Sequence, residues 1–141
     1  MPITARSLKN YQVEVDSHGH HFIVDEPVSV GGDDAGPDPY DILLGALAGC
    51  KIITVQMYAR RKGWPLEGVQ VSMSHNRVHA EDCEDCDSET KGKLDLIEVD
   101  ISFKGDLTGE QVDRLKQISE RCPVHKTLTS DTKIKTKLVA S

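Results

Sequence analysis

Alternating apolar and polar positions predict β-strands at residues 11–15, 69–75 and 96–105. Two short apolar runs lie within residues 20–32, before and after a proline, and the second run ends on two glycines. The N-terminal third therefore predicts a β-meander with turns at SHGH and DEP. A last strand is expected at 133–139.

A long helix with both ends marked is predicted in the segment GPDPYDILLGALAGCKIITVQMYARRKGW. Asp38 can cap it, Pro39 suits its first position, and Asp41 places a carboxylate in its first turn. At the other end, Gly63 suits a left-handed cap after three basic residues that suit the last turn. The basic residues are Arg60, Arg61 and Lys62.

Almost every side chain of this helix between Ile42 and Tyr58 is apolar or small. A helix that is apolar all round is expected to be buried on most sides. Gly45 and Gly49 each cost about 1 kcal/mol relative to alanine in a helix interior. They lie four residues apart on one face, where the expected compensation is close approach of another backbone, such as a second copy of this helix.

A second, amphipathic helix is predicted after Thr108 and Gln111, which form a capping-box pattern. Its apolar positions include Leu115 and Ile118, and Cys122 falls on the same face at the helix end. The element order is then β-β-β-α-β-β-α-β, an α+β arrangement. A chain of 141 residues suits a single domain over residues 1–141.

Composition and charge narrow the class of protein. Apolar residues make up 38% of the chain and charged residues 28%, which is typical of a globular protein. A formal charge of -6 argues against nucleic acid as a partner, because phosphate binding needs a basic surface. No membrane span and no signal peptide are expected, so the predicted location is cytoplasmic. Four cysteines in a reducing compartment favour metal binding or redox chemistry over a disulfide framework.

Two cysteines are predicted on the inner faces of the two helices. If the helices pack together, the sulfurs of Cys50 and Cys122 can meet; the alternative is that both are ordinary buried cysteines. His125 and Lys126 follow Cys122 closely, and a nearby cation favours the reactive thiolate. The negative end of the second helix opposes this effect. Cys50, in the middle of its helix, needs a cation from elsewhere.

The segments GPDPYDILLGALAGC and RCPVHKTL together resemble the OsmC/Ohr family of thiol-dependent peroxide reductases, in a branch often called OsmC-like or YhfA-like. The resemblance implies an intertwined homodimer with active sites at the subunit interface. It implies that Cys50 is the peroxidatic thiol and Cys122 the resolving thiol. Organic hydroperoxides would be the substrates, and a small dithiol or a thiol-bearing protein the reductant. No cofactor is required for this chemistry.

The resemblance is incomplete at the residues that activate the first cysteine. The family's glutamate, ten residues before that cysteine, is Tyr40 here, with Asp41 as the adjacent carboxylate. The family's arginine has no counterpart in the predicted N-terminal strands, where His20 and its neighbours offer a weaker, pH-dependent charge. Asp41 also suits a role at the helix start, and the histidines suit a polar turn. These departures favour an alternative function, a non-catalytic dimer that binds a small ligand or a metal.

A second group of metal-ligating residue types lies in an acidic insertion at about 79–91. The motif H-x3-H-x3-C-x2-C comprises His75, His79, Cys83 and Cys86. Two histidines and two cysteines can form a tetrahedral zinc site, although this spacing is not that of a standard zinc finger. The alternatives are a solvated hairpin tip and an auxiliary redox pair, whose thiols the neighbouring carboxylates would make poor nucleophiles.

Overall fold

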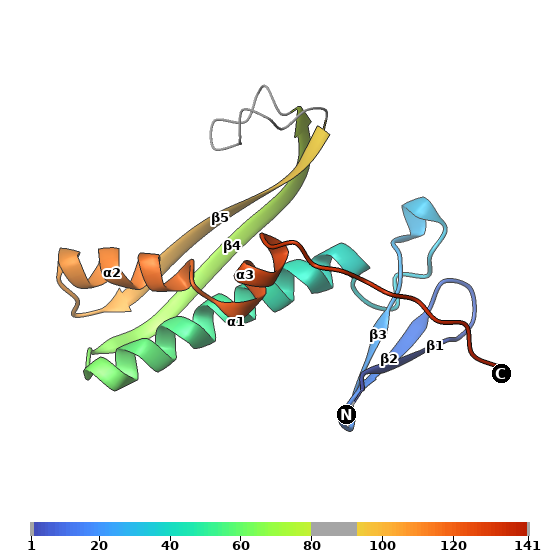
Figure 1. The fold of residues 1–141 in the computed structure, drawn as a ribbon, viewed down its shortest axis with the longest axis horizontal. Coiled ribbons are helices and arrows are strands. Elements are labelled where there is room, and N and C mark those ends of the chain that lie inside the picture. The colour runs from blue at the N-terminus through green and yellow to red at the C-terminus, as the bar shows by residue number, and fades with distance from the viewer. Residues whose placement is uncertain (1, 80–92, 141) are drawn as a thin grey trace. The chain divides into compact units, whose positions relative to one another are not determined.

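The computed structural model describes residues 2–79 and 93–140 and has an α+β fold, as predicted (Figure 1). Its backbone contacts separate into two compact units, Met1–Ala46 and Leu47–Ser141. The division falls inside the long helix α1 (Pro39–Lys62). The acidic insertion and its two cysteines lie outside the described residues.

The N-terminal unit is built on an antiparallel sheet in the order β1-β2-β3. The strands are β1 (Thr4–Ser7), β2 (Val13–Ser17) and β3 (His20–Val24). His18 and Gly19 both have positive φ angles, 52° and 91°. Two such residues match the twist of a tight hairpin, so the predicted turn at SHGH is confirmed. β1 was not predicted, because TARS carries no strong alternation.

The second apolar run after the proline is not a strand, which corrects the sequence prediction. Val28–Val30 forms a short 3-10 helix, η1, in which Gly31 closes the turn through a hydrogen bond from its N–H to the carbonyl oxygen of Val28. Gly31 has a φ of 98°, which glycine adopts without strain. Two valines around a serine, between a proline and a glycine, are too few to set the backbone by pattern alone.

Asp25 organises the loop that leads from β3 to α1. Its side chain is 1% exposed and accepts hydrogen bonds from the backbone N–H groups of Glu26, Asp33 and Ala35, at 2.7, 3.2 and 3.0 Å. These bonds favour the carboxylate, that of Ala35 most strongly, and they hold the pKa of Asp25 below its usual value against the opposing effect of burial. The loop is thus ordered around one buried charge.

Both predicted ends of α1 are confirmed. The Asp38 carboxylate accepts a hydrogen bond from the backbone N–H of Asp41 at 2.8 Å, Pro39 is the first residue of the helix, and Gly63 follows its end with a φ of 71°. By length and composition, α1 is able to cross a membrane, contrary to the expectation from the sequence. Core helices share that composition, so the absence of a membrane partner stays a prediction.

α1 buries one narrow stripe rather than most of its surface. The buried residues recur every four positions, at Leu47, Lys51, Val55 and Ala59. On other faces Ile53 and Met57 are 57% and 66% exposed. A Cβ atom at Gly45 or Gly49 would meet no described atom within 4 Å. The prediction of burial on most sides therefore fails for the single chain, because one set of partner elements covers one face of a helix.

The C-terminal unit contains a long antiparallel hairpin of β4 (Leu66–His79) and β5 (Lys93–Gly105). Its half-buried face carries the cross-strand pairs Val69–Phe103, Val71–Ile101 and Met73–Val99. Between this hairpin, α1 and the helix α2 (Gly109–Ser119) lies a core built on Val55, Ala59, Leu115 and Ile118. Trp64 packs against that core.

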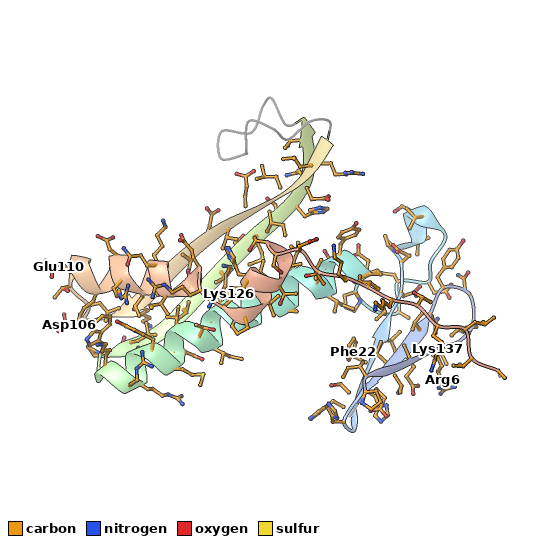
Figure 2. The ribbon with its side chains drawn as sticks, in the orientation of Figure 1. Arg6, Phe22, Asp106, Glu110, Lys126 and Lys137 are labelled. Carbon is orange, nitrogen blue, oxygen red and sulfur yellow. The ribbon has the colours of Figure 1, made fainter. Side chains whose placement is uncertain are left out.

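The capping box predicted at the start of α2 is confirmed. The Thr108 side chain accepts from the N–H of Gln111, and the Gln111 side chain accepts from the N–H of Thr108. Figure 2 shows Asp106 and Glu110 at this end of the helix, where the positive end of the helix dipole stabilises carboxylates.

The chain after α2 differs from the prediction in two ways. α2 ends at Ser119, and Cys122 caps the start of a separate helix, α3 (Pro123–Leu128), instead of ending α2. Pro123 explains the break, since it suits the first position of a helix and disfavours a helical residue before it. Residues 133–139 form no strand and are exposed. In the described part of the chain, no neighbouring strand forms β-sheet hydrogen bonds with their backbone N–H and C=O groups.

A candidate thiol site in the C-terminal unit

The C-terminal unit brings Cys50 and Cys122 together. Both are free thiols; Cys50 is half-buried on α1, and Cys122 is fully buried at the start of α3. The two side chains lie close enough for Cys50 to influence the protonation of Cys122. Figure 1 shows α3 beside the middle of α1, the part of the helix that carries Cys50. The pair therefore joins two segments that lie about seventy residues apart in the sequence.

The surroundings of Cys122 favour its protonated form. Burial raises the pKa of this thiol, and the neighbouring Cys50 side chain raises it further. The backbone N–H of His125 donates to the Cys122 sulfur at 3.3 Å and acts in the opposite direction, as does the charge of Lys51. The sequence predicted that Cys122 would lie at the negative end of the second helix, which disfavours a thiolate. Cys122 instead precedes α3 and does not end α2.

Lys51 supplies a cation that the sequence analysis missed. Its side chain is 3% exposed, and its ammonium group donates to the carbonyl oxygen of Ser119 at 3.0 Å. The same nitrogen lies 2.9 Å from Nδ1 of His125. A signal was present in the sequence: Lys51 is a charged residue on the four-residue stripe of Leu47 and Val55. A buried lysine needs polar partners, so this position already marked a polar site.

His125 is held neutral, in contrast to the positive charge expected from the sequence. Burial lowers the pKa of its imidazole, and the charge of Lys51 lowers it further, while Glu120 acts weakly in the opposite sense. A lysine ammonium group has only donors, so Nδ1 accepts from it and the ring proton resides on Nε2. The positive charge beside the thiol pair is therefore that of Lys51. Lys126 lies on the exposed side of α3 (Figure 2).

The remaining residues predicted to support the thiols belong to the N-terminal unit. Tyr40 and Asp41 are in the first turn of α1, where the backbone of Asp41 takes part in the helix cap. His20 is exposed at the start of β3, paired with Ser17. Their roles at the thiol pair stay predictions.

The predicted zinc ligands are not assembled among the residues that the structure describes. His75 lies on β4, and its Nε2 is 2.9 Å from the Asp95 carboxylate across the hairpin. His79 ends the strand, and Cys83 and Cys86 lie outside the described residues. Within residues 2–79 and 93–140, no three metal-ligating side chains gather. The zinc site stays a prediction.

Comparison with known proteins identifies the family. The model of the family described as OsmC-like protein matches residues 31–137, which include all the residues of the thiol site. The chain belongs to the OsmC-like family. No curated protein matches it.

Solved structures share the OsmC-like fold at low sequence identity. An OsmC-like protein from Mycoplasma pneumoniae has a TM-score of 0.69 and 20% identity, with 90% of this chain and 85% of that chain covered. An organic hydroperoxide resistance protein, OsmC, from Legionella pneumophila has a TM-score of 0.64 and 17% identity, with 91% and 88% covered. An organic hydroperoxide resistance protein from Elizabethkingia anophelis has a TM-score of 0.63 and 16% identity, with 93% of this chain and 90% of that chain covered.

Proposed function

We propose that this OsmC-like protein reduces organic hydroperoxides through a disulfide cycle between Cys50 and Cys122. The observation that carries the proposal is that these two free thiols, on α1 and at the start of α3, lie close enough to interact. The names of two structural neighbours, both organic hydroperoxide resistance proteins, point to the same chemistry. The predicted cytoplasmic location agrees with it, because thiols stay reduced there.

The burial of each thiol supports its role in the cycle. Cys50 is the more exposed of the two, so a hydroperoxide reaches it more readily. Its thiolate attacks the outer oxygen of the O–O bond, which breaks; the other oxygen leaves as an alcohol after taking a proton, and Cys50 becomes a sulfenic acid. Cys122 is buried and its pKa is raised, which suits a thiol that acts only on a neighbouring sulfur.

The second step closes the disulfide. The Cys122 sulfur attacks the Cys50 sulfur, the S–O bond breaks, and the departing oxygen takes the Cys122 proton and leaves as water. A small dithiol or a thiol-bearing protein then donates two electrons and two protons, which restores both thiols. The cycle requires no cofactor.

We also propose that the working unit is a homodimer. The exposed apolar face of α1, with Ile53 and Met57, and the open space above Gly45 and Gly49 suit close packing against a second copy. Light scattering after size-exclusion chromatography should give twice the mass of the 15.5 kDa chain. Ile53→Lys should give the mass of a monomer; an unchanged dimer would place the interface elsewhere.

A single-turnover reaction with cumene hydroperoxide tests the catalytic proposal. The reduced protein should lose two thiols per chain, and Cys122→Ser should instead give a Cys50 sulfenic acid that dimedone labels. The double variant Cys83→Ser, Cys86→Ser is the control and should still lose two. Equal thiol loss in Cys50→Ser would refute the assignment. Unreactive thiols together with a ligand or metal retained in native mass spectrometry would favour the binding function instead.

A further inference from the structure

The turn that carries Cys122 is held at both ends by one side chain. Lys51 on α1 binds the carbonyl oxygen of Ser119, the last residue of α2, at 3.0 Å. It also binds the imidazole of His125 in α3 at 2.9 Å. Cys122 lies between these two attachment points. Lys51, one residue after Cys50, thereby joins the segment of one thiol to the segment of the other.

His125 connects Lys51 to the Cys122 sulfur. Its ring accepts from Lys51, and its backbone N–H donates to the sulfur of Cys122 at 3.3 Å. The orientation of the sulfur therefore depends on the same residue whose ring Lys51 holds. No buried side-chain nitrogen or oxygen among the described residues lacks a hydrogen-bond partner, so the buried polar atoms of Lys51 and His125 all have one.

A lysine at this position is not explained by packing. Its neighbours on the buried stripe, Leu47 and Val55, are apolar, and a methionine would fill a similar volume without burying a charge. Burying an ammonium group is costly unless hydrogen bonds compensate for the lost water. Beside its charge near the thiols, Lys51 therefore contributes the two hydrogen bonds it makes.

We propose that Lys51 is a positioning residue for disulfide formation: it holds the turn from Ser119 to His125 so that the Cys122 sulfur faces Cys50. This inference rests on the proposed disulfide cycle. A disulfide requires the two Cα atoms to come within about 7 Å and the sulfurs to meet at a defined dihedral angle. Holding reacting groups in place raises the rate of such an intramolecular step, and a misplacement of about 1 Å can slow a reaction by about 100-fold.

Lys51→Met removes both hydrogen bonds and keeps an unbranched side chain. After a pulse of cumene hydroperoxide, closure of the Cys50 sulfenic acid to the disulfide should slow by about 10-fold to 100-fold. The longer-lived sulfenic acid should accumulate as sulfinic acid, seen by mass spectrometry. Formation of the sulfenic acid is measured separately in a Cys122→Ser background, where it reports how the loss of the Lys51 charge affects Cys50, so that the closure step is judged on its own rate. Lys62→Met, at an exposed position of the same helix, is the matched control.

Two variants of His125 separate positioning from general stability. His125→Asn retains an acceptor at the place of Nδ1 and should close the disulfide at nearly the normal rate. His125→Leu removes the acceptor and should behave like Lys51→Met. Nitrogen NMR of the unmodified protein should show the His125 proton on Nε2, and Lys51→Met should change that tautomer population. Each variant is first checked for native folding by circular dichroism.

A second way of forming the disulfide distinguishes failure of this inference from failure of the proposed function. Oxidised glutathione forms a mixed disulfide at Cys50 and releases one glutathione; Cys122 then displaces the second glutathione. Lys51→Met should slow this closure too. If peroxide does not react but closure still depends on Lys51, only the peroxidase function fails. If closure is equally fast in the variant, or the His125 proton is on Nδ1, the positioning role is refuted.

Discussion

Leu115→Ala tests how far the C-terminal unit depends on the contact between α1 and α2. Leu115 is fully buried, in a core that it shares with Val55, Ala59 and Ile118. Truncation to alanine removes the transfer free energy of the lost groups and leaves a cavity that the two helices and the hairpin can fill only partly. The expected loss in free energy of unfolding is about 3–5 kcal/mol, a large part of the stability of a typical domain.

The assay is equilibrium urea unfolding followed by tryptophan fluorescence. Trp64 is the single tryptophan of the chain, and it packs against this core with its ring 5.5 Å from that of Tyr58. All variants are compared at one protein concentration, because the stability of the proposed dimer would depend on it.

Leu115→Met is the matched control. It keeps nearly the same volume and should cost less than about 1.5 kcal/mol. A loss below about 1 kcal/mol for the alanine variant would show that this core contributes little to stability. Equal losses for both variants would show that the cavity is not the cause.

Three further predictions concern the cap, the loop and the buried thiol. Thr108→Ala should cost about 0.5–2 kcal/mol by removing the capping box, whereas Thr108→Ser should cost little; urea unfolding measures both. Backbone N–H groups, first that of Ala35, hold the pKa of Asp25 below its usual value. Its stabilising contribution is therefore present above the unfolded-state pKa of about 4 and lost as the pH falls through the lower folded-state value. Asp25→Asn should lower the melting temperature at neutral pH and flatten its acid dependence; an unchanged acid dependence would contradict this origin. Because burial raises the pKa of Cys122, alkylation of this thiol in Cys50→Ser should follow a pKa above that of an ordinary cysteine, and a rate profile matching free cysteine would contradict the buried site.

Local signals located most of the elements correctly. Three features were predicted from neighbouring residues in the sequence: the ends of α1, the capping box of α2 and the hairpin turn at SHGH. The predicted strands at 69–75 and 96–105 lie inside β4 and β5, which are longer than the alternation indicated. Two predicted strands were wrong: the short segment Val28–Val30 forms η1, and residues 133–139 remain without a strand.

The thiol site was predicted in part. The sequence pointed to Cys50 and Cys122 through motifs that resemble a family, and the structure places the two thiols in contact. Lys51 was overlooked, because a single lysine in a helix usually faces solvent. His125 was expected to be a cation, but burial and the nearby Lys51 keep it neutral.

The sequence by itself determined the α+β class, both ends of α1 and the capped start of α2, and it pointed to Cys50 and Cys122, because these features depend on periodicity, capping residues and short motifs. Only the tertiary structure decided which face of α1 is buried, that Cys122 caps α3, and that Lys51 bridges Ser119 and His125. Those outcomes depend on contacts between segments about seventy residues apart, and burial and charge act through space rather than along the chain.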